Sequence, residues 1–182
     1  FASDVDANKY FNKVIEAYEQ FKQLCGGFEG KLYSTGNPDV DYYNLFNRFD
    51  YSNIEEVTLT KDYSRALGVP NNLGMIAWLY GYEGCSYTLD LVQSYLSKDG
   101  RSVDVTDTKQ VPEIGVRYLT ELANKLDPRF RQSVFIPGDL INSVTPPYAD
   151  SLFTVPQLHL PDLNRNTTSG FSPKKGHNPA SP

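Results

Sequence analysis

"LDPRFRQSVF", Leu126 to Phe135, is the stretch from which the predicted fold is built. Asp127 carries a carboxylate that can accept the free N–H groups of a helix's first turn. Pro128 follows at the first helical position, where a residue without an N–H loses no hydrogen bond. The pair predicts a short helix that begins directly after Asp127.

Two more helices are predicted upstream of this stretch. Over 112–126, Pro112 stands at the entry, and apolar residues recur at steps of four: Ile114, Tyr118, Leu122 and Leu126. Over 88–100, "TLDLVQSYLSKDG", Thr88 can cap the helix and Gly100 suits a left-handed residue after it. One face of that helix would carry Leu89, Val92 and Leu96.

The clearest periodic pattern is at the start of the chain and predicts an amphipathic helix over 3–25. Its apolar residues are spaced by three and four: Tyr10, Phe11, Val14, Tyr18, Phe21 and Cys25. Ser3 with Asp6 resembles a capping box, and the pair Gly26 and Gly27 is expected to end the helix.

Strand signals are few. Residues 55–60 and 101–107 alternate and are expected to form short strands, and a short extended piece is expected at 153–155. We expect loops over 26–53 and a long irregular connection over 61–86. Seven of the twelve prolines lie between Pro146 and Pro182, so the end of the chain is expected to be irregular. The fold class is therefore mainly α with long loops and a few short β-strands.

The bulk composition bounds the class of protein. The chain has 182 residues, 40% of them hydrophobic and 21% charged, which is typical of a globular domain. A net charge of −5 argues against nucleic-acid binding, which needs clustered Lys and Arg. Apolar runs are too short to span a membrane. Because the chain begins with Phe1 and its one Met is Met75, we expect it to be a fragment of a longer protein.

Candidates for catalysis or metal binding are weak. Glu55 and Glu56 are adjacent on an expected strand, so their side chains would point to opposite faces and could not flank one bond. His159 and His177 lie in the proline-rich tail without metal-site spacing, and we expect both on the solvent side. We therefore expect no enzyme activity, no metal and no cofactor. Cys25 and Cys85 are expected to stay unpaired.

The aromatic-rich segment "MIAWLYGYEGCSYT", Met75 to Thr88, has two structural interpretations. It could be a buried strand, with Met75, Ile76 and Leu79 in the core. It could also form a flat aromatic surface, since Trp78, Tyr80 and Tyr82 would share one face of an extended segment. Such a surface, with polar side chains beside it, suits the C–H faces and hydroxyl edges of sugars.

Three pieces in order resemble the SusD/RagB family of glycan-binding lipoproteins of the Bacteroidetes. They are "TLDLVQSYLSKDGRSV" (88–103), "LDPRFRQSVF" (126–135) and "SGFSPKK" (169–175). "DANKYFNKVIEAYEQF" (6–21) and "YSNIEEVTLT" (51–60) also resemble family segments. The chain departs from the family pattern at four positions and would be a divergent member: Tyr87, Gln93, Leu126 and Phe171.

The resemblance implies a fold built on tetratricopeptide-like helical repeats, of which this chain would be the middle-to-late part. We expect a single partial SusD-like region over 1–182. A repeat-type helix would cover 1–27, a loop-rich mixed region 28–145, and a proline-rich irregular segment 146–182. The quoted motifs are structural, so Asp127 and Arg129 are expected to hold the backbone and not a ligand.

The resemblance also implies a function. Such proteins of starch utilisation systems sit on the outer membrane, exposed at the surface through a lipid anchor that this chain lacks. They capture oligosaccharide or polysaccharide for a SusC-like, TonB-dependent transporter. We expect carbohydrate to be bound by Trp78, Tyr80, Tyr82, Asn71, Asn72 and Glu83. Three alternatives stay open: a peptide-binding member of the family, a glycoside hydrolase, and a non-catalytic structural fragment.

Overall fold

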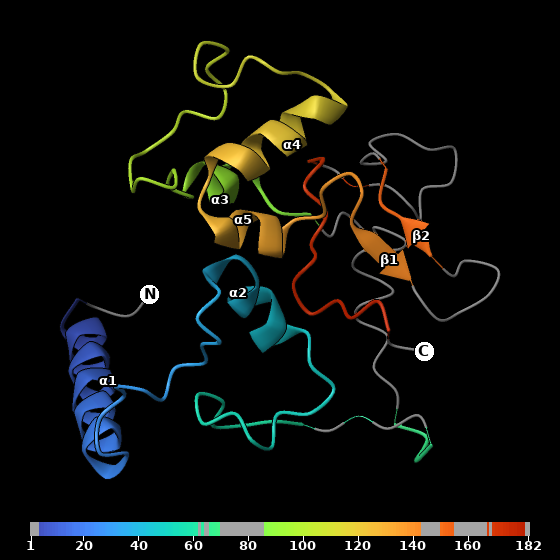
Figure 1. Cartoon of the computed structure of the whole chain (residues 1–182). Coiled ribbons are helices and arrows are strands. Elements are labelled where there is room, and N and C mark those ends of the chain that lie inside the picture. The colour runs from blue at the N-terminus through green and yellow to red at the C-terminus, as the bar shows by residue number, and fades with distance from the viewer. Residues whose placement is uncertain are drawn as a thin grey trace. The chain divides into compact units, whose positions relative to one another are not determined.

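The computed structural model describes residues 4–61, 63, 66–69, 86–142, 150–154, 167 and 169–180. It is mainly helical with one small sheet, as the sequence predicts (Figure 1). In chain order the elements are α1 (Asp4–Leu24), α2 (Pro38–Phe46), α3 (Leu89–Gln93), α4 (Val116–Lys125), α5 (Pro128–Ser133), β1 (Leu140–Asn142) and β2 (Ser151–Leu152).

The chain divides into two compact units. The first consists of Phe1–Tyr33 and Ser52–Leu59, and the second of Ser34–Tyr51 and Thr60–Pro182. The first therefore contains α1 alone among the helices, whereas the second contains α2 to α5 and the sheet. Each unit is described by itself below.

In the first unit, the predicted N-terminal helix is confirmed as α1. Its C-terminal end is confirmed too, because Gly26 and Gly27 adopt positive φ values of 69° and 94°. The chain then returns so that the Phe28 ring lies 5.7 Å from the ring centroids of both Tyr18 and Phe21. The apolar side chains nearer the start of α1 are exposed: Tyr10, Phe11, Val14 and Ile15.

The strand predicted over 55–60 is wrong. Residues 51–61 form turns and irregular backbone, and no strand of the described segments lies alongside them. The carboxylates of Glu55 and Glu56 instead contact the loop that follows α1. Glu56 Oε2 accepts a hydrogen bond of 2.7 Å from the N–H of Tyr33, and Glu55 Oε2 lies 3.7 Å from Lys31 Nζ. These contacts replace the ladder that a partner strand would supply.

The core of the second unit forms where α3, α4 and α5 meet (Figure 1). The predicted helix start at Asp127 is confirmed. Its Oδ1 accepts a hydrogen bond of 2.9 Å from the N–H of Arg129, and Pro128 is the first helical residue. Fully buried side chains surround this junction: Val92, Leu122, Leu126, Phe130 and Val134.

Two predicted helices are shorter than expected. The side chain of Thr88 caps α3 as predicted, accepting 3.2 Å from the N–H of Leu91, but the helix ends at Gln93. Of its expected apolar face only Val92 is buried, whereas Leu89 and Leu96 are 43% and 41% exposed. The helix α4 begins at Val116 after Gly115 (φ 63°), so Pro112 is not at its entry and Ile114 is exposed.

The strand predicted over 101–107 is also wrong, although its alternation is real. Val103 and Val105 are both buried, yet the only described pairing is an isolated bridge between Leu96 and Ser102. The carboxamide of Gln93 takes the place of a partner strand. Its Oε1 accepts 3.0 Å from the N–H of Val105, and its Nε2 donates to the carbonyl of Val103.

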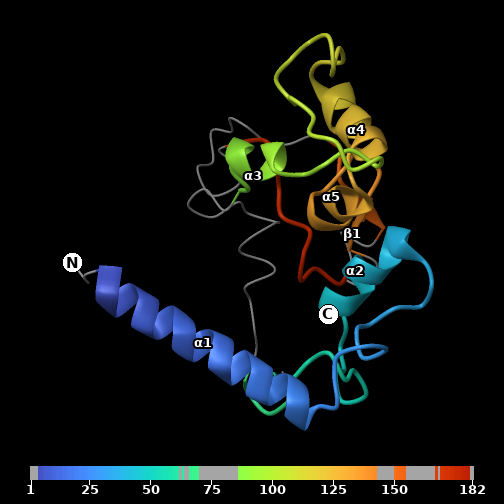
Figure 2. The same cartoon turned by 90° about the vertical axis from the view of Figure 1, so that its left-hand side faces the viewer.

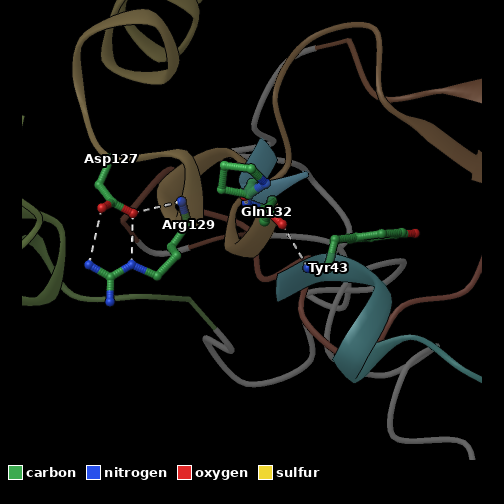
Figure 3. A network of polar contacts seen from close by, with 5 residues as sticks. Tyr43, Asp127, Arg129 and Gln132 are labelled. Carbon is green, nitrogen blue, oxygen red and sulfur yellow. Dashed lines mark hydrogen bonds and ion pairs between the residues drawn. The ribbon is translucent and has the colours of Figure 1, made fainter. Parts of the chain in front are cut away.

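The helix α2 lies in a stretch that the sequence predicted to be loop. Asn37 Oδ1 accepts 3.2 Å from the N–H of Asp39, and Pro38 is the first helical residue. The buried carboxamide of Gln132 on α5 then joins the two helices (Figure 3). Its Oε1 accepts 2.8 Å from the N–H of Tyr43, and its Nε2 donates to the carbonyl of Pro38 at 2.9 Å.

The small sheet pairs β1 with β2 in antiparallel fashion, with Leu140 opposite Leu152. The sequence predicts a short extended piece at 153–155, whereas the structure has its strand, β2, directly before this range. Phe153 nevertheless belongs to the same hairpin. Its N–H donates 2.7 Å to the carbonyl of Asp139, its carbonyl accepts 2.7 Å from the N–H of Gly138, and its ring stacks 5.3 Å from that of Phe135.

Residues 169–180, here called the C-terminal strap, run beside α5 in both views (red in Figures 1 and 2). The N–H of Phe135 donates 2.9 Å to the carbonyl of Ser172, and the N–H of Lys174 donates 2.7 Å to that of Ser133. His177 is 1% exposed, so its predicted place on the solvent side is wrong. The irregular tail still packs because its backbone groups pair with the end of α5.

Replacement of Gln132 with alanine should lower the free energy of unfolding by about 2 kcal/mol. It removes two hydrogen bonds and leaves the N–H of Tyr43 and the carbonyl of Pro38 without this partner. Urea unfolding followed by circular dichroism measures the change. Gln20→Ala, on the exposed surface of α1, is the matched control and should change it by less than about 0.5 kcal/mol. Equal effects of the two variants would contradict the bridging role.

Candidate functional site

The six residues that the sequence predicts to bind carbohydrate all lie outside the described residues: Trp78, Tyr80, Tyr82, Asn71, Asn72 and Glu83. The core candidates Met75, Ile76 and Leu79 lie outside them as well, as do His159 and Cys85. Cys25 is a free thiol. The nearest described residue downstream of the predicted site is Ser86, followed by Tyr87. The candidate site is therefore built from Tyr87 and its surroundings in the second unit.

Three half-buried tyrosines from different parts of the second unit form what we call the tyrosine cluster: Tyr42, Tyr87 and Tyr95. Tyr42 lies on α2, Tyr87 precedes α3, and Tyr95 follows α3. The phenol of Tyr42 acts on the ionisation of both Tyr87 and Tyr95. Burial raises the pKa of Tyr87 to about 12, and the phenols of Tyr95 and Tyr42 add to the effect.

The C-terminal strap fixes Tyr87. Its N–H donates 3.0 Å to the carbonyl of Phe171, and its own carbonyl accepts 2.5 Å from the hydroxyl of Ser169. Gly170 follows in a turn with φ 84°, where its N–H donates 2.8 Å to the hydroxyl of Thr167. The chain thus leaves the undescribed aromatic segment and enters α3 along a fixed backbone path.

Tyr95 is held by the core. Its ring meets that of Phe130 edge-on, with centroids 5.5 Å apart. Burial raises the pKa of the Tyr95 phenol, while the Ser133 hydroxyl works in the opposite direction. The ring therefore rests on α5, and its polar end lies in partly desolvated surroundings.

Tyr42 lies at the edge of the tyrosine cluster, which we call its rim, beside Lys175 of the C-terminal strap. Its ring meets that of Phe46 edge-on at 4.9 Å, one helical turn along α2. Lys175 Nζ donates 2.9 Å to the Tyr42 hydroxyl and lies 3.6 Å from the Phe46 ring centroid. A cation over an aromatic face is attracted by the ring quadrupole. The rim therefore carries a positively charged donor with a defined position.

Arg129 and Asp127 add a charged pair on the α5 side (Figure 3). Arg129 Nε and Nη2 donate to the two carboxylate oxygens of Asp127 at 2.7 and 3.1 Å. The hydrogen bond to Arg129 lowers the pKa of the Asp127 carboxyl and raises that of the guanidinium. Asp127 fulfils the backbone role expected from the sequence.

Contacts with Asp139 and Tyr43 hold the C-terminal strap in place. Lys174 Nζ lies 2.8 Å from Asp139 Oδ2 and 5.2 Å from the centroid of the Tyr43 ring. The Tyr43 hydroxyl donates 2.9 Å to the carbonyl of His177. Burial lowers the pKa of His177 to about 4. Lys174 is therefore fixed inside, while its neighbour Lys175 remains exposed.

The site offers aromatic rings, phenol hydroxyls and charged donors, which suit the binding of a polar ligand. Acid–base chemistry would need a base or a carboxylate pair placed around one bond. In the described segments, Asp127 is already paired with Arg129 and Asp139 with Lys174. Within the same segments no three His, Cys, Asp or Glu side chains are grouped as metal ligands would be.

A shallow hollow lies along α1, lined by Asn8, Lys9, Asn12, Lys13 and Glu16. Its walls are exposed side chains of one helix, so it does not enclose a ligand. Of the helices described, none is both long enough and apolar enough to cross a membrane.

The sequence did not identify Tyr42, Phe46 or Lys175 as site residues. The first two were missed because 26–53 was expected to be loop. "NPD", Asn37 to Asp39, is the signal that could have revealed α2: an N-cap residue, a proline at the first position and an acidic first turn. A helix there brings Tyr42 and Phe46 to neighbouring turns. No local signal could have placed Lys175, which reaches α2 across the fold.

No family model, curated protein or solved structure matches the chain.

Acidification should weaken the fold between pH 6.5 and about 4. In this window the unfolded chain protonates His177, whereas the folded chain keeps the buried ring neutral. The free energy of unfolding should therefore fall with pH, by ~3 kcal/mol at the lower limit. Lys174 and Asp139 are the charged groups that act on the ring.

The measurement is urea unfolding at a series of pH values, for the unaltered chain and for His177→Gln. The variant lacks the titrating ring, so the stability difference between the two proteins should shrink as the pH falls. Parallel stability curves across pH 6.5 to 4 would contradict the buried neutral histidine.

Proposed function

We propose that the protein binds glycans without cleaving them, as a SusD-like surface protein would. The observation that carries the proposal is the tyrosine cluster on its helical support, with Lys175 held against Tyr42. Aromatic rings stack on the C–H faces of sugars, while phenols and cations hydrogen-bond to hydroxyl groups. The sequence-predicted residues Trp78, Tyr80 and Tyr82 precede Tyr87 by nine, seven and five positions, and we propose that they also bind the glycan.

The motifs shared with the SusD/RagB family support the proposal from the sequence side. The Thr88 cap, the Asp127 cap and the strap residue Lys174 each make specific contacts in the structure. Motifs that act on backbone and core are typical of a shared scaffold, on which the binding residues vary. We propose that the repeat-type helical architecture of that family applies to the chain.

The partners proposed from this resemblance are a glycan ligand and a TonB-dependent, SusC-like transporter. The proposed location is the outer surface of the outer membrane, reached through a lipid anchor as in that family. A transporter gene immediately upstream, with genes for glycoside hydrolases nearby, would support both proposals. Genes for peptidases in the same place would favour the peptide-binding alternative instead.

We propose a non-catalytic role, and the pairing of the carboxylates near the cluster supports it. A hydrolase needs one carboxyl group to protonate the leaving oxygen and a second to act on the opposite side of the bond. Incubation of the protein with common polysaccharides, followed by a reducing-sugar assay, tests this directly. Release of sugar above the level of a boiled control would overturn the binding-only function.

Tyr42→Ala should weaken glycan binding about tenfold, because it removes one ring and the phenol that positions Lys175. Affinity electrophoresis in gels that contain different polysaccharides measures the change in retention. Tyr10→Ala is the matched control, since Tyr10 is an exposed tyrosine of α1 outside the cluster. If both variants are retained like the unaltered protein, the cluster is not the binding surface.

Trp78→Ala should abolish retention in the same gels while the circular dichroism spectrum is unchanged. This variant tests the sequence-predicted part of the surface separately from the cluster. Unfolding of the variant would show that Trp78 belongs to the core. A folded variant with full retention would restrict the binding surface to the described residues.

A further inference from the structure

Lys175 is the charged group of the site with no acidic partner. In the portion of the chain that the structure describes, its ammonium makes no ion pair, whereas Lys174 is paired with Asp139 and Arg129 with Asp127. Lys175 is nevertheless held in place. It donates to the Tyr42 hydroxyl and lies over the rings of Phe46 and Tyr42, 3.6 and 5.0 Å from their centroids.

The donors that remain are those that would bind an anion. An ammonium has three N–H groups, and the Tyr42 hydroxyl takes one of them. The hydroxyl of Tyr42 and the ring of Phe46 hold this ammonium in one position. Two N–H groups of Lys175 therefore remain for a ligand beside one ring of the cluster.

The charge of the surroundings makes this arrangement specific. The whole chain carries a net charge of −5, so an anionic ligand is repelled by most of its surface. Asp127 neutralises Arg129, whereas no carboxylate of the described segments is paired with Lys175. Hydrogen bonds from a cation to a carboxylate or sulfate are about twice as strong as those between neutral groups.

We propose that the glycan bound at the tyrosine cluster is acidic, and that its carboxylate or sulfate is held by Lys175. This inference rests on the proposed glycan-binding function. A sugar ring against the tyrosines would place an acidic substituent next to these donors. An acidic peptide would satisfy the cation but has no rigid C–H face to cover the rings.

The test compares four probes of matched length by isothermal titration calorimetry at low salt. They are an oligogalacturonate, a chondroitin sulfate oligosaccharide, a neutral cello-oligosaccharide and an oligoglutamate peptide. At least one acidic sugar should bind about tenfold more tightly than the neutral one, and added salt should reduce this preference. A preference for the oligogalacturonate, which carries carboxylates only, identifies carboxylate as the bound group. A preference for the chondroitin sulfate that is lost with unsulfated chondroitin identifies sulfate.

Substitutions of Lys175 assign the preference to its charge. Lys175→Gln should reduce affinity for the acidic sugar about tenfold and leave the neutral sugar unchanged. Lys175→Arg keeps the charge and should retain most of the preference. Lys98→Gln removes an exposed lysine elsewhere in the second unit and should bind like the unaltered protein. Circular dichroism confirms that each variant is folded.

The other outcomes separate the two proposals. Equal binding of neutral and acidic sugars, or equal losses for both in Lys175→Gln, would overturn the acidic ligand and leave glycan binding in place. If no sugar binds to the folded protein, the glycan-binding function fails and the acidic ligand fails with it. Binding of the oligoglutamate alone would overturn both and favour the peptide-binding alternative.

Discussion

The bridge that Gln132 makes between α5 and α2 is the contact on which the second unit depends most. One buried carboxamide accepts from Tyr43 and donates to Pro38, residues that precede it by 89 and 94 positions. A buried amide must satisfy both of its ends, and here one orientation satisfies both. This fixes the position of α2 against the core, and with it Tyr42 and Phe46 on the same helix.

The same kind of contact recurs wherever a regular partner is absent. Gln93 binds the backbone of 103–105 as a neighbouring strand would, and Ser133 and Phe135 pair with the strap. The unit therefore holds long irregular segments by side-chain and local backbone hydrogen bonds more than by sheet. The tyrosine cluster is assembled from such segments, which is why residues from α2, from both ends of α3 and from the strap meet there.

The parts of the fold that the sequence predicts are those with local causes. Asp127 with Pro128, Thr88, and Gly26 with Gly27 each act on their own backbone, and all three are found as predicted. Tertiary causes were not predictable. Val103 and Val105 alternate because both are buried, in a loop whose backbone is bound by the side chain of Gln93. His177 is buried because the strap packs beside the end of α5. The contact between Tyr42 and Lys175 depends on the Gln132 bridge and on the path of the strap. No local sequence pattern therefore links the two residues.

The central claim is that the tyrosine cluster is a ligand surface, and aromatic-ring NMR tests it most directly. Spectra of the protein with labelled tyrosines would be recorded while an oligosaccharide is added. The ring signals of Tyr42, Tyr87 and Tyr95 should shift together and saturate, while those of Tyr10 and Tyr18 on α1 stay unchanged. Saturable binding that leaves all three cluster tyrosines unshifted would contradict the claim.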